Sequence, residues 1–283
     1  MTLSAVLDHA IINVRDRLDR AQDTFGRLGF TLTPRGHHTL GSSNHLCMFD
    51  ENYLELLGYE SAAQRPELAR QPLGLGGLVF KMRDAEESFQ HLRRSGVEAE
   101  APRAFQRPVA LGETRGATMH EARFQTVHLA PGQVPYGRVF FCQHETPELV
   151  WQPQWQSHAN GVTHIAAFIL AADDVQEATQ LYQAMFGADA FTECADGSRM
   201  LAAGKAWVHC LPAPRTLALF QQQERFPSLP CMAGLVFHTT SLELVRQACA
   251  SGGIAVREEN DALLVDGADA LGVPLMFIAR SYA

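Results

Sequence analysis

Four short segments rich in apolar residues open four similar stretches of the chain. They are LDHAIINVRD from Leu7, LGGLVFKMRD from Leu75, VTHIAAFILA from Val162 and MAGLVFHTTS from Met232. After each opening, apolar residues recur every three or four positions, which is the period of a helix, and short runs typical of strands follow. The pattern predicts an α+β protein built from four βαβββ modules.

Polar residues and glycines stand where these helices are expected to begin and end. Asp and Ser side chains accept hydrogen bonds from the free amides of a first helical turn, and Gly suits the left-handed turn that closes a helix. The predicted starts are Asp16, Asp84, Asp173 or Asp174, and Ser241, and the predicted ends are Gly29, Gly96, Gly187 and Gly252.

A stretch rich in Trp, Gln and Pro, from Thr146 to Gly161, separates the second module from the third. With 283 residues, 46% of them hydrophobic, the chain can bury one large core or two ordinary ones. We predict two domains of two modules each, at residues 1–145 and 161–283, joined by a linker over residues 146–160.

Each module has a helix on only one face of its sheet, so the other face must be paired or used. In the first strand, the row expected under the helix is Ala10, Ile12 and Val14, and the opposite row is Leu7, His9, Ile11 and Asn13. In the third module, the row expected under the helix is Ile165, Ala167 and Ile169. We expect the opposite rows to line a cup.

Charge and composition exclude several classes of function. A net charge of -8 and the lack of Lys or Arg runs argue against a nucleic-acid partner. No 18 apolar residues run together and no signal peptide is indicated, so no membrane association is expected. The six cysteines are scattered and none lies in a CxxC motif, which is typical of reduced thiols. We expect a soluble, cytoplasmic protein that acts on a small molecule.

The motifs DHAIINV, RLGF, TLTPRGHHTLGSSNHLCMFDENYLELLG and YGRVFFCQHETPELVW carry a family likeness. With them the chain resembles the glyoxalase-like branch of the vicinal oxygen chelate superfamily. The resemblance implies that two modules pair into one cup-shaped domain, so that the four modules form two such domains. The likeness is concentrated in the first 160 residues, and the rest matches only through the βαβββ pattern.

In that superfamily, the first and last strands of each module hold a divalent metal, and the resemblance implies His9 and Glu55 as its ligands here. The equivalent positions of the second module, Gly77 and about Phe141, cannot bind a metal. Because a catalytic site needs three protein ligands, His144 or His45 is the candidate third, although strand parity places His144 opposite Phe141. Such a set suits zinc, manganese, iron or nickel. The alternative is that His9 and Glu55 are hydrogen-bonding groups of a ligand cup without metal.

Glu55 is the candidate catalytic residue. It shares a strand face with Tyr53 and Leu57, and a partly apolar cavity favours a carboxylate that acts as a general base. The alternative is a solvated glutamate that protects a sheet edge.

Side chains that can donate hydrogen bonds to a substrate lie in the segments before and after this strand. The predicted substrate-binding residues are Arg35, His38, Asn44, His45, Tyr53 and Arg107. Arg107 lies in a long segment between Gly96 and Phe124, also holding Arg103 and Arg115, that is expected to be a lid. The alternatives are a polar hairpin with incidental histidines and a surface excursion with solvated arginines.

The second half has His164, His209 and His238, which we expect to face one cup, but no carboxylate joins them. It is therefore expected to be a degenerate domain, with a structural role or a role in forming a homodimer.

The leading hypothesis is a metal-dependent lyase or isomerase that moves a proton next to a carbonyl, with Glu55 as base or metal ligand. The alternatives are a metal-free protein that binds or sequesters a small molecule or an antibiotic, and a relative of ring-cleaving dioxygenases. The resemblance does not select among these chemistries.

Overall fold

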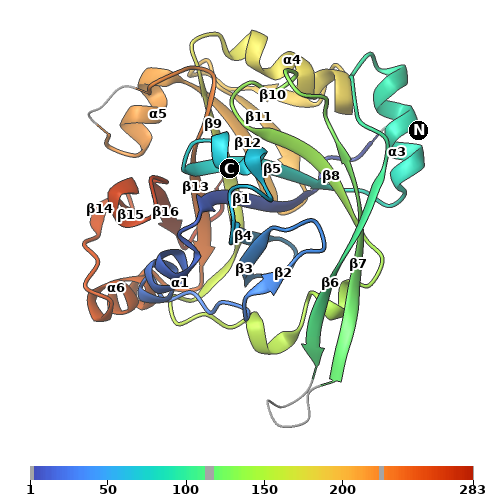
Figure 1. Ribbon diagram of the computed structural model, residues 1–283. Helices are drawn as coiled ribbons and strands as arrows, with labels where there is room; N and C mark the ends of the chain where they lie inside the picture. Colours follow the sequence, from blue (N-terminus) through green and yellow to red (C-terminus); the bar gives the residue numbers. More distant parts are fainter. Residues whose placement is uncertain (1–2, 112–117, 223–225, 283) are drawn as a thin grey trace.

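The computed structural model describes residues 3–111, 118–222 and 226–282 (Figure 1). The first half forms one eight-stranded sheet in the order β2-β3-β4-β1-β5-β8-β7-β6. Its strands are β1 (Leu7–Arg15), β2 (Gly36–His37), β3 (Ser43–Met48), β4 (Tyr53–Gly58), β5 (Gly74–Lys81), β6 (Arg103–Leu111), β7 (Thr118–His128) and β8 (Arg138–His144), and its helices are α1 (Leu18–Arg27), α2 (Pro66–Arg70) and α3 (Ala85–Arg94).

The second half repeats this plan in a sheet of order β10-β11-β12-β9-β13-β16-β15-β14. Its strands are β9 (Val162–Ala172), β10 (Phe191–Glu193), β11 (Arg199–Ala203), β12 (Ala206–Pro212), β13 (Cys231–Thr239), β14 (Arg257–Glu259), β15 (Ala262–Val265) and β16 (Leu275–Ile278). Its helices are α4 (Val175–Phe186), α5 (Ala213–Leu219) and α6 (Leu242–Ser251), and short 3₁₀ turns lie at Pro147–Leu149, Pro153–Trp155 and Gly267–Asp269.

Both sheets are pairs of βαβββ modules, as the periodicity predicts. In each half, the first strands of the two modules pair antiparallel at the centre, β1 with β5 and β9 with β13. The first and last strands of a module pair parallel, as β1 does with β4. This pairing places His9 beside Tyr53 and Ile11 beside Glu55.

The helix starts follow the predicted caps in three of the four modules. The side chains of Asp84, Asp174 and Ser241 accept hydrogen bonds from backbone amides at the starts of α3, α4 and α6. The prediction for Asp16 is wrong, because α1 begins after Arg17 and has no side-chain cap.

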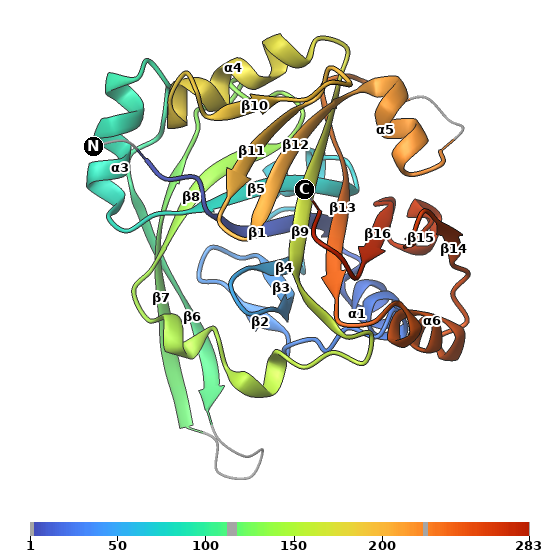
Figure 2. The same cartoon turned by 180° about the vertical axis from the view of Figure 1, so that it is seen from behind.

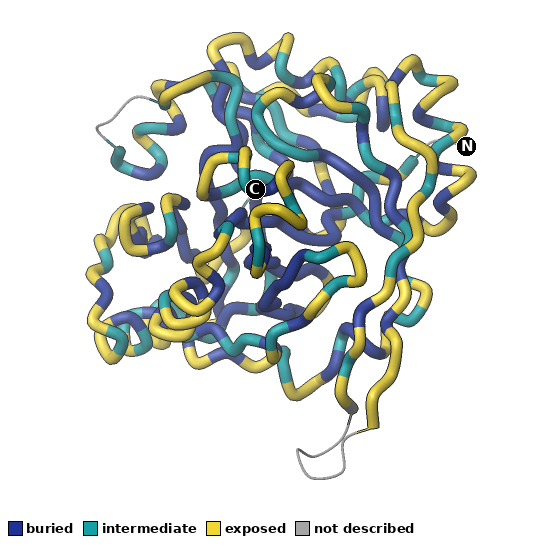
Figure 3. The backbone as a smooth tube through the Cα atoms, viewed as in Figure 1, coloured by how far each residue is buried: buried dark blue, intermediate teal, exposed yellow. Residues whose placement is uncertain are grey.

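The two halves share one apolar core, formed on the helix-covered faces of the sheets. Helix α1 contacts α6 and α3 contacts α4, and Figures 1 and 2 show these pairs side by side. Phe30 and Phe49 of the first half pack against Phe237 of the second, with ring centroids 5.3 and 5.8 Å apart. The central strands are accordingly buried in Figure 3, while the outer helix faces and the end of the β6–β7 hairpin are exposed.

β-bulges change the strand faces that simple alternation predicts. Asp8 is the extra residue between the pairs of Leu7 with Phe80 and His9 with Val79, so Leu7 joins the core under the helices instead of the cup. A second bulge at Ala166 exchanges the two faces of β9 for the residues that follow it. The row under the helices continues from Ile165 to Phe168 and Leu170, and Ala167 and Ile169 face the second cup.

Each cup has its own smaller apolar cluster, separate from the shared core. The predicted lid between Gly96 and Phe124 is mainly the β6–β7 hairpin, which forms a wall of the first cup and extends beyond the rest of the sheet in Figures 1 and 2. Arg115 lies outside the described residues. No described helix is long and apolar enough to cross a bilayer.

A buried amide, Asn52, between β3 and β4 contributes two hydrogen bonds to the contact between the halves. Its Oδ1 accepts from the Ile165 backbone amide at 2.9 Å, and its Nδ2 donates to the Ile165 carbonyl at 3.2 Å. In Asn52→Ala, both backbone groups lose their partners in a buried place. We expect the free energy of unfolding, measured by urea denaturation, to fall by about 1–3 kcal/mol. The exposed Gln90→Ala is the control, and equal stability of the two variants would contradict this role.

Candidate functional site

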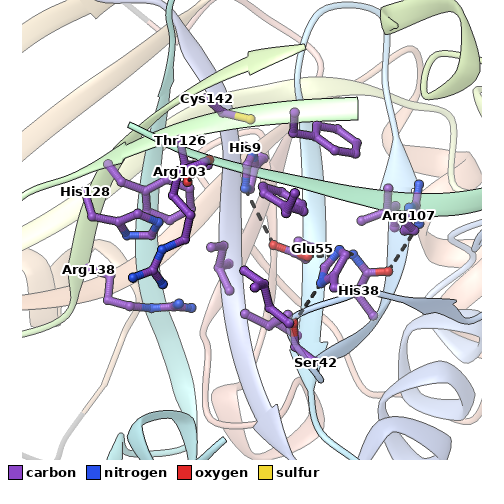
Figure 4. Close-up of a pocket in the computed structure, with 18 of the residues that line it drawn as sticks. His9, His38, Ser42, Glu55, Arg103, Arg107, Thr126, His128, Arg138 and Cys142 are labelled. Atoms are coloured by element: carbon purple, nitrogen blue, oxygen red, sulfur yellow. Dashed lines mark hydrogen bonds and ion pairs between the residues drawn. The ribbon is translucent and has the colours of Figure 1, made fainter. Parts of the chain in front are cut away.

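One cavity of about 120 Å³ lies inside the cup of the first sheet (Figure 4). Strands β1, β3, β4, β6, β7 and β8 contribute side chains to its wall. Alternate residues of three of these strands face it: Arg103, Phe105 and Arg107 from β6, Phe124, Thr126 and His128 from β7, and Arg138, Phe140 and Cys142 from β8. This is the period-two rule for one face of a sheet.

His9 and Glu55 meet in this cavity from neighbouring strands. Nε2 of His9 lies 3.6 Å from Oε2 of Glu55, and both side chains are almost completely buried. The His9 ring stacks on the Tyr53 ring with centroids 4.3 Å apart, which fixes the plane of the imidazole. The expected shared face of β1 and β4 is therefore present.

Asn44 of β3 connects Glu55 to two other polar side chains. Its Nδ2 donates to Oε1 of Glu55 at 2.6 Å and lies 3.2 Å from Nε2 of His38, and its Oδ1 accepts from Nη1 of Arg107 at 3.2 Å. A guanidinium only donates, so this contact fixes which end of the amide faces Arg107. Nε2 of His38 must then accept, and the ring proton is on Nδ1, which donates to Oγ of Ser42 at 2.8 Å.

Two features hold this network in place. Gly36 allows Arg107 to approach, because a Cβ at this position would lie 2.5 Å from Nη1 of Arg107. Burial, with a smaller contribution from the positive charge of Arg107, lowers the pKa of His38 to about 4 against the opposing effect of Glu55. His38 is therefore neutral at pH 7, as its acceptor role requires.

The structure gathers six of the predicted site residues around the cavity, namely His9, His38, Asn44, Tyr53, Glu55 and Arg107. Two others lie elsewhere. Arg35 forms surface ion pairs with Asp19 and Glu60. His45 points to the opposite face of β3, where its Nδ1 is 2.9 Å from the Thr33 carbonyl oxygen.

His144 does not join His9 and Glu55. Its Nε2 lies 2.7 Å from the carboxylate of Asp8, which is fully buried and whose Oδ1 is 3.4 Å from Nδ1 of His9. Burial alone would raise the pKa of Asp8, but His144 and His9 together hold it below its usual range. Asp8 therefore links the two histidines as a buried anion.

The predicted position of Phe141 is wrong, and this changes the comparison with a four-ligand metal site. Phe141 packs in the shared core against Phe80 and Phe186, and its neighbours Phe140 and Cys142 face the cavity. Strand parity does place His144 on the opposite face of β8 from Phe141, and this opposite face is the one that lines the cup.

The donors around His9 and Glu55 do not fit a metal site of three or four ligands. The second module offers Gly77 and Phe140 at the relevant positions. Within the described ranges, only Asp8, Cys142 and His144 bring three donor atoms of this kind within 4.8 Å of one another. Oxygen, sulfur and nitrogen ligands suit zinc, but Asp8 and His144 are hydrogen-bonded to each other.

The sequence analysis missed three polar residues of the cup: Asp8, which is buried beside His9 and His144, and His128 and Arg138, which line the cavity. Strand alternation could have found the last two, since FQTVH and GRVFFC place them in line with other cavity residues. Burial and the charges of the nearby arginines together lower the pKa of His128 to about 3, so this ring is neutral. Asp8 carried no such signal, because its position depends on the bulge.

The three histidines of the second half do not share one cup. His164 and His238 stack on each other with ring centroids 4.9 Å apart. His209 lies at a separate cavity, where its ring nitrogens are each 2.8 Å from the hydroxyls of Tyr282 and Ser198.

Comparison with known proteins supports the architecture. The model of one protein family, described as a glyoxalase-like domain, matches residues 7–186. No curated protein matches the chain. Among solved structures, a hypothetical protein from Staphylococcus aureus has 15% identity and a TM-score of 0.68, and the match covers 96% of this chain and 98% of that chain.

Two enzymes among the solved structures have a similar fold. A xylose isomerase-like TIM barrel/4-hydroxyphenylpyruvate dioxygenase fusion protein has 10% identity and a TM-score of 0.63, over 100% of this chain and 50% of that chain. A mutant of 4-hydroxymandelate synthase from Streptomyces coelicolor has 13% identity and a TM-score of 0.56, over 99% and 95%. Identities this low show a shared fold alone.

His38 is expected to make stability depend on pH. Its pKa falls from 6.5 in the unfolded chain to about 4 on folding, so between these values the unfolded chain binds the extra proton. The free energy of unfolding should be highest above pH 6.5 and decrease towards pH 4, by up to about 1.4 kcal/mol per pH unit from this group. In urea denaturation at pH 7 and pH 5, the decrease in the free energy of unfolding should be smaller for His38→Gln than for the unchanged protein.

The matched control is His120→Gln, which removes an exposed histidine of β7. Its pH dependence should equal that of the unchanged protein. If His38→Gln also retains the full decrease, then His38 is not held neutral by the fold.

Proposed function

Because the chain belongs to the glyoxalase-like domain family, whose model matches more than half of it, we propose that it is an enzyme that moves a proton next to the carbonyl of a small molecule. Glu55 is the base in this proposal. The reaction class is that of a lyase or an isomerase.

One observation carries the proposal: Glu55 is a buried carboxylate whose two oxygens differ. Oε1 accepts the short hydrogen bond from Asn44, whereas Oε2 faces the cavity beside His9. A general base must be held in place and still have a free lone pair directed at the proton it removes. The Asn44 contact provides the first condition and the cavity-facing oxygen the second.

In the proposed step, a proton leaves the carbon next to the carbonyl and goes to Oε2 of Glu55. The electron pair of the broken C–H bond forms the double bond of an enolate, and the carbonyl oxygen takes the negative charge. Donors fixed in the cavity wall stabilise that charge, since they need no reorganisation during the reaction. Return of the proton to another atom gives an isomer, and departure of a group from the adjacent carbon gives the lyase product.

Asp8 is a positioning residue in this scheme. Its Oδ1 lies 3.4 Å from Nδ1 of His9, whereas Nε2 of the same ring lies 3.6 Å from Oε2 of Glu55. With the stacking on Tyr53, these contacts keep the His9 ring in one orientation beside Glu55.

No step of the proposal passes through a metal, because His9 and Glu55 lack a third donor in the described chain. The same shortage counts against the dioxygenase alternative, since non-haem iron oxygenases use two histidines and one carboxylate. An oriented carboxylate is not needed by a sequestration protein, so this alternative has no observation in its favour.

The proposal is tested by deuterium exchange. The protein is incubated in D₂O with a set of small 2-oxo acids and aldehydes that have a hydrogen next to the carbonyl, and NMR measures deuterium uptake at that carbon. We expect exchange with part of this set. Glu55→Gln should slow the exchange at least ~100-fold, because glutamine has the same size as glutamate but its amide does not take up the proton.

Glu60→Gln, which changes an exposed glutamate paired with Arg35, is the control and should exchange like the unchanged protein. Equal exchange by the Glu55→Gln variant would exclude Glu55 as the base.

A further inference from the structure

We propose that Arg138 and Arg103 form an oxyanion-binding subsite in the cavity, and that the ligand carries a carboxylate or a similar oxyanion group. This inference rests on the proposed function, because it names the class of substrate on which Glu55 would act. In Figure 4 the two arginines lie on one side of His9, next to His128, and Arg107 and His38 lie on the other.

The guanidinium of Arg138 lacks an internal partner. Its Nε and Nη2 atoms are buried and have no hydrogen-bond acceptor among the described residues, although Arg138 lines the cavity. Burying a charge without a partner is costly, and arginine is almost always paired when buried. A ligand that offers two acceptor oxygens to the planar fork would remove this cost.

Other positive groups converge on the same place. Arg103 and Arg65 line the cavity with Arg138, and all three lower the pKa of His128 by their charge. Arg65 is paired with Glu67. His128 stacks on Phe140 with ring centroids 4.3 Å apart. Because His128 is neutral, it does not compensate the positive charge of Arg138 and Arg103 beside it.

The charge of the cavity is opposite to that of the whole protein. The chain has a net charge of -8, yet the described residues that line the cavity include four arginines and only one carboxylate, Glu55. Acidic proteins do not attract anions over long distances. The local excess of arginine is therefore a property of this one site and selects for a negatively charged ligand there.

The size and the remaining walls limit the ligand further. The cavity of about 120 Å³ is of the same order as the apolar cavity of roughly 150 Å³ that holds one benzene in an engineered protein, so the apolar body of the ligand is about one ring in size. Phe105 and Phe124 are stacked with ring centroids 4.9 Å apart and line the wall with Phe140. A compact ligand with one anionic end and an apolar body fits these walls.

Binding of benzoate and of its neutral isostere benzamide tests the subsite. Calorimetry on the full chain should give at least tenfold tighter binding of benzoate. Arg138→Met should lose this preference by weakening benzoate at least tenfold without weakening benzamide, and Arg138→Lys should lose part of it, because lysine keeps the charge but not the fork. Benzenesulfonate and inorganic phosphate show which oxyanion is preferred.

Two controls separate binding from folding. Arg123→Met changes an exposed arginine of β7 that pairs with Glu145, and it should bind benzoate like the unchanged protein. Without ligand, Arg138→Met should melt at the same or a higher temperature, since an unpaired buried charge is removed.

Equal affinity for benzoate and benzamide, or unchanged benzoate binding by Arg138→Met, would overturn the subsite. That result leaves the proton-transfer proposal intact if Glu55→Gln still abolishes deuterium exchange. Conversely, Arg138-dependent binding of benzoate supports the subsite even if no carbonyl compound exchanges, and only the role of Glu55 would then fail.

Discussion

A single buried amide, Asn44, orders the functional cavity. It donates to Glu55, faces His38 and accepts from Arg107, so three groups of different charge are held by one side chain. Buried polar groups are costly unless every partner is present. The glycine at Gly36, the neutral state of His38 and the direction of the Glu55 carboxylate all depend on this arrangement, and so does any chemistry at the free oxygen of Glu55.

The cavity obtains its positive charge from side chains of the protein. The resemblance to the vicinal oxygen chelate superfamily implies a metal whose ligands come from both modules. Here the second module has Gly77 and Phe140 at the positions of its ligands. Arg138, Arg103 and Arg107 supply cationic donors instead. The fold is therefore that of the superfamily while the donor set of the cup differs from the one that the resemblance implies, which is why the fold alone does not identify the reaction.

Periodicity predicted the four modules and the face of each strand, because both follow from local repeats of 3.6 and 2 residues. That His9 and Glu55 come together was implied by the resemblance to the superfamily. Periodicity could not predict the bulges at Asp8 and Ala166, which depend on pairing with a neighbouring strand. The bulge in β1 explains why Asp8, next to His144, was missed. Arg138 was missed for a different reason: the wrong face was assigned to Phe141, and the true alternation of β8 places Arg138 in the cavity.

The most direct measurement of the central claim is a crystal structure of the benzoate complex. We expect a carboxylate bound to the guanidinium of Arg138, with the ring between the phenylalanines of the cup and its far edge towards Glu55. A benzoate bound only outside the cavity, or one whose carboxylate points away from Arg138, would contradict this expectation.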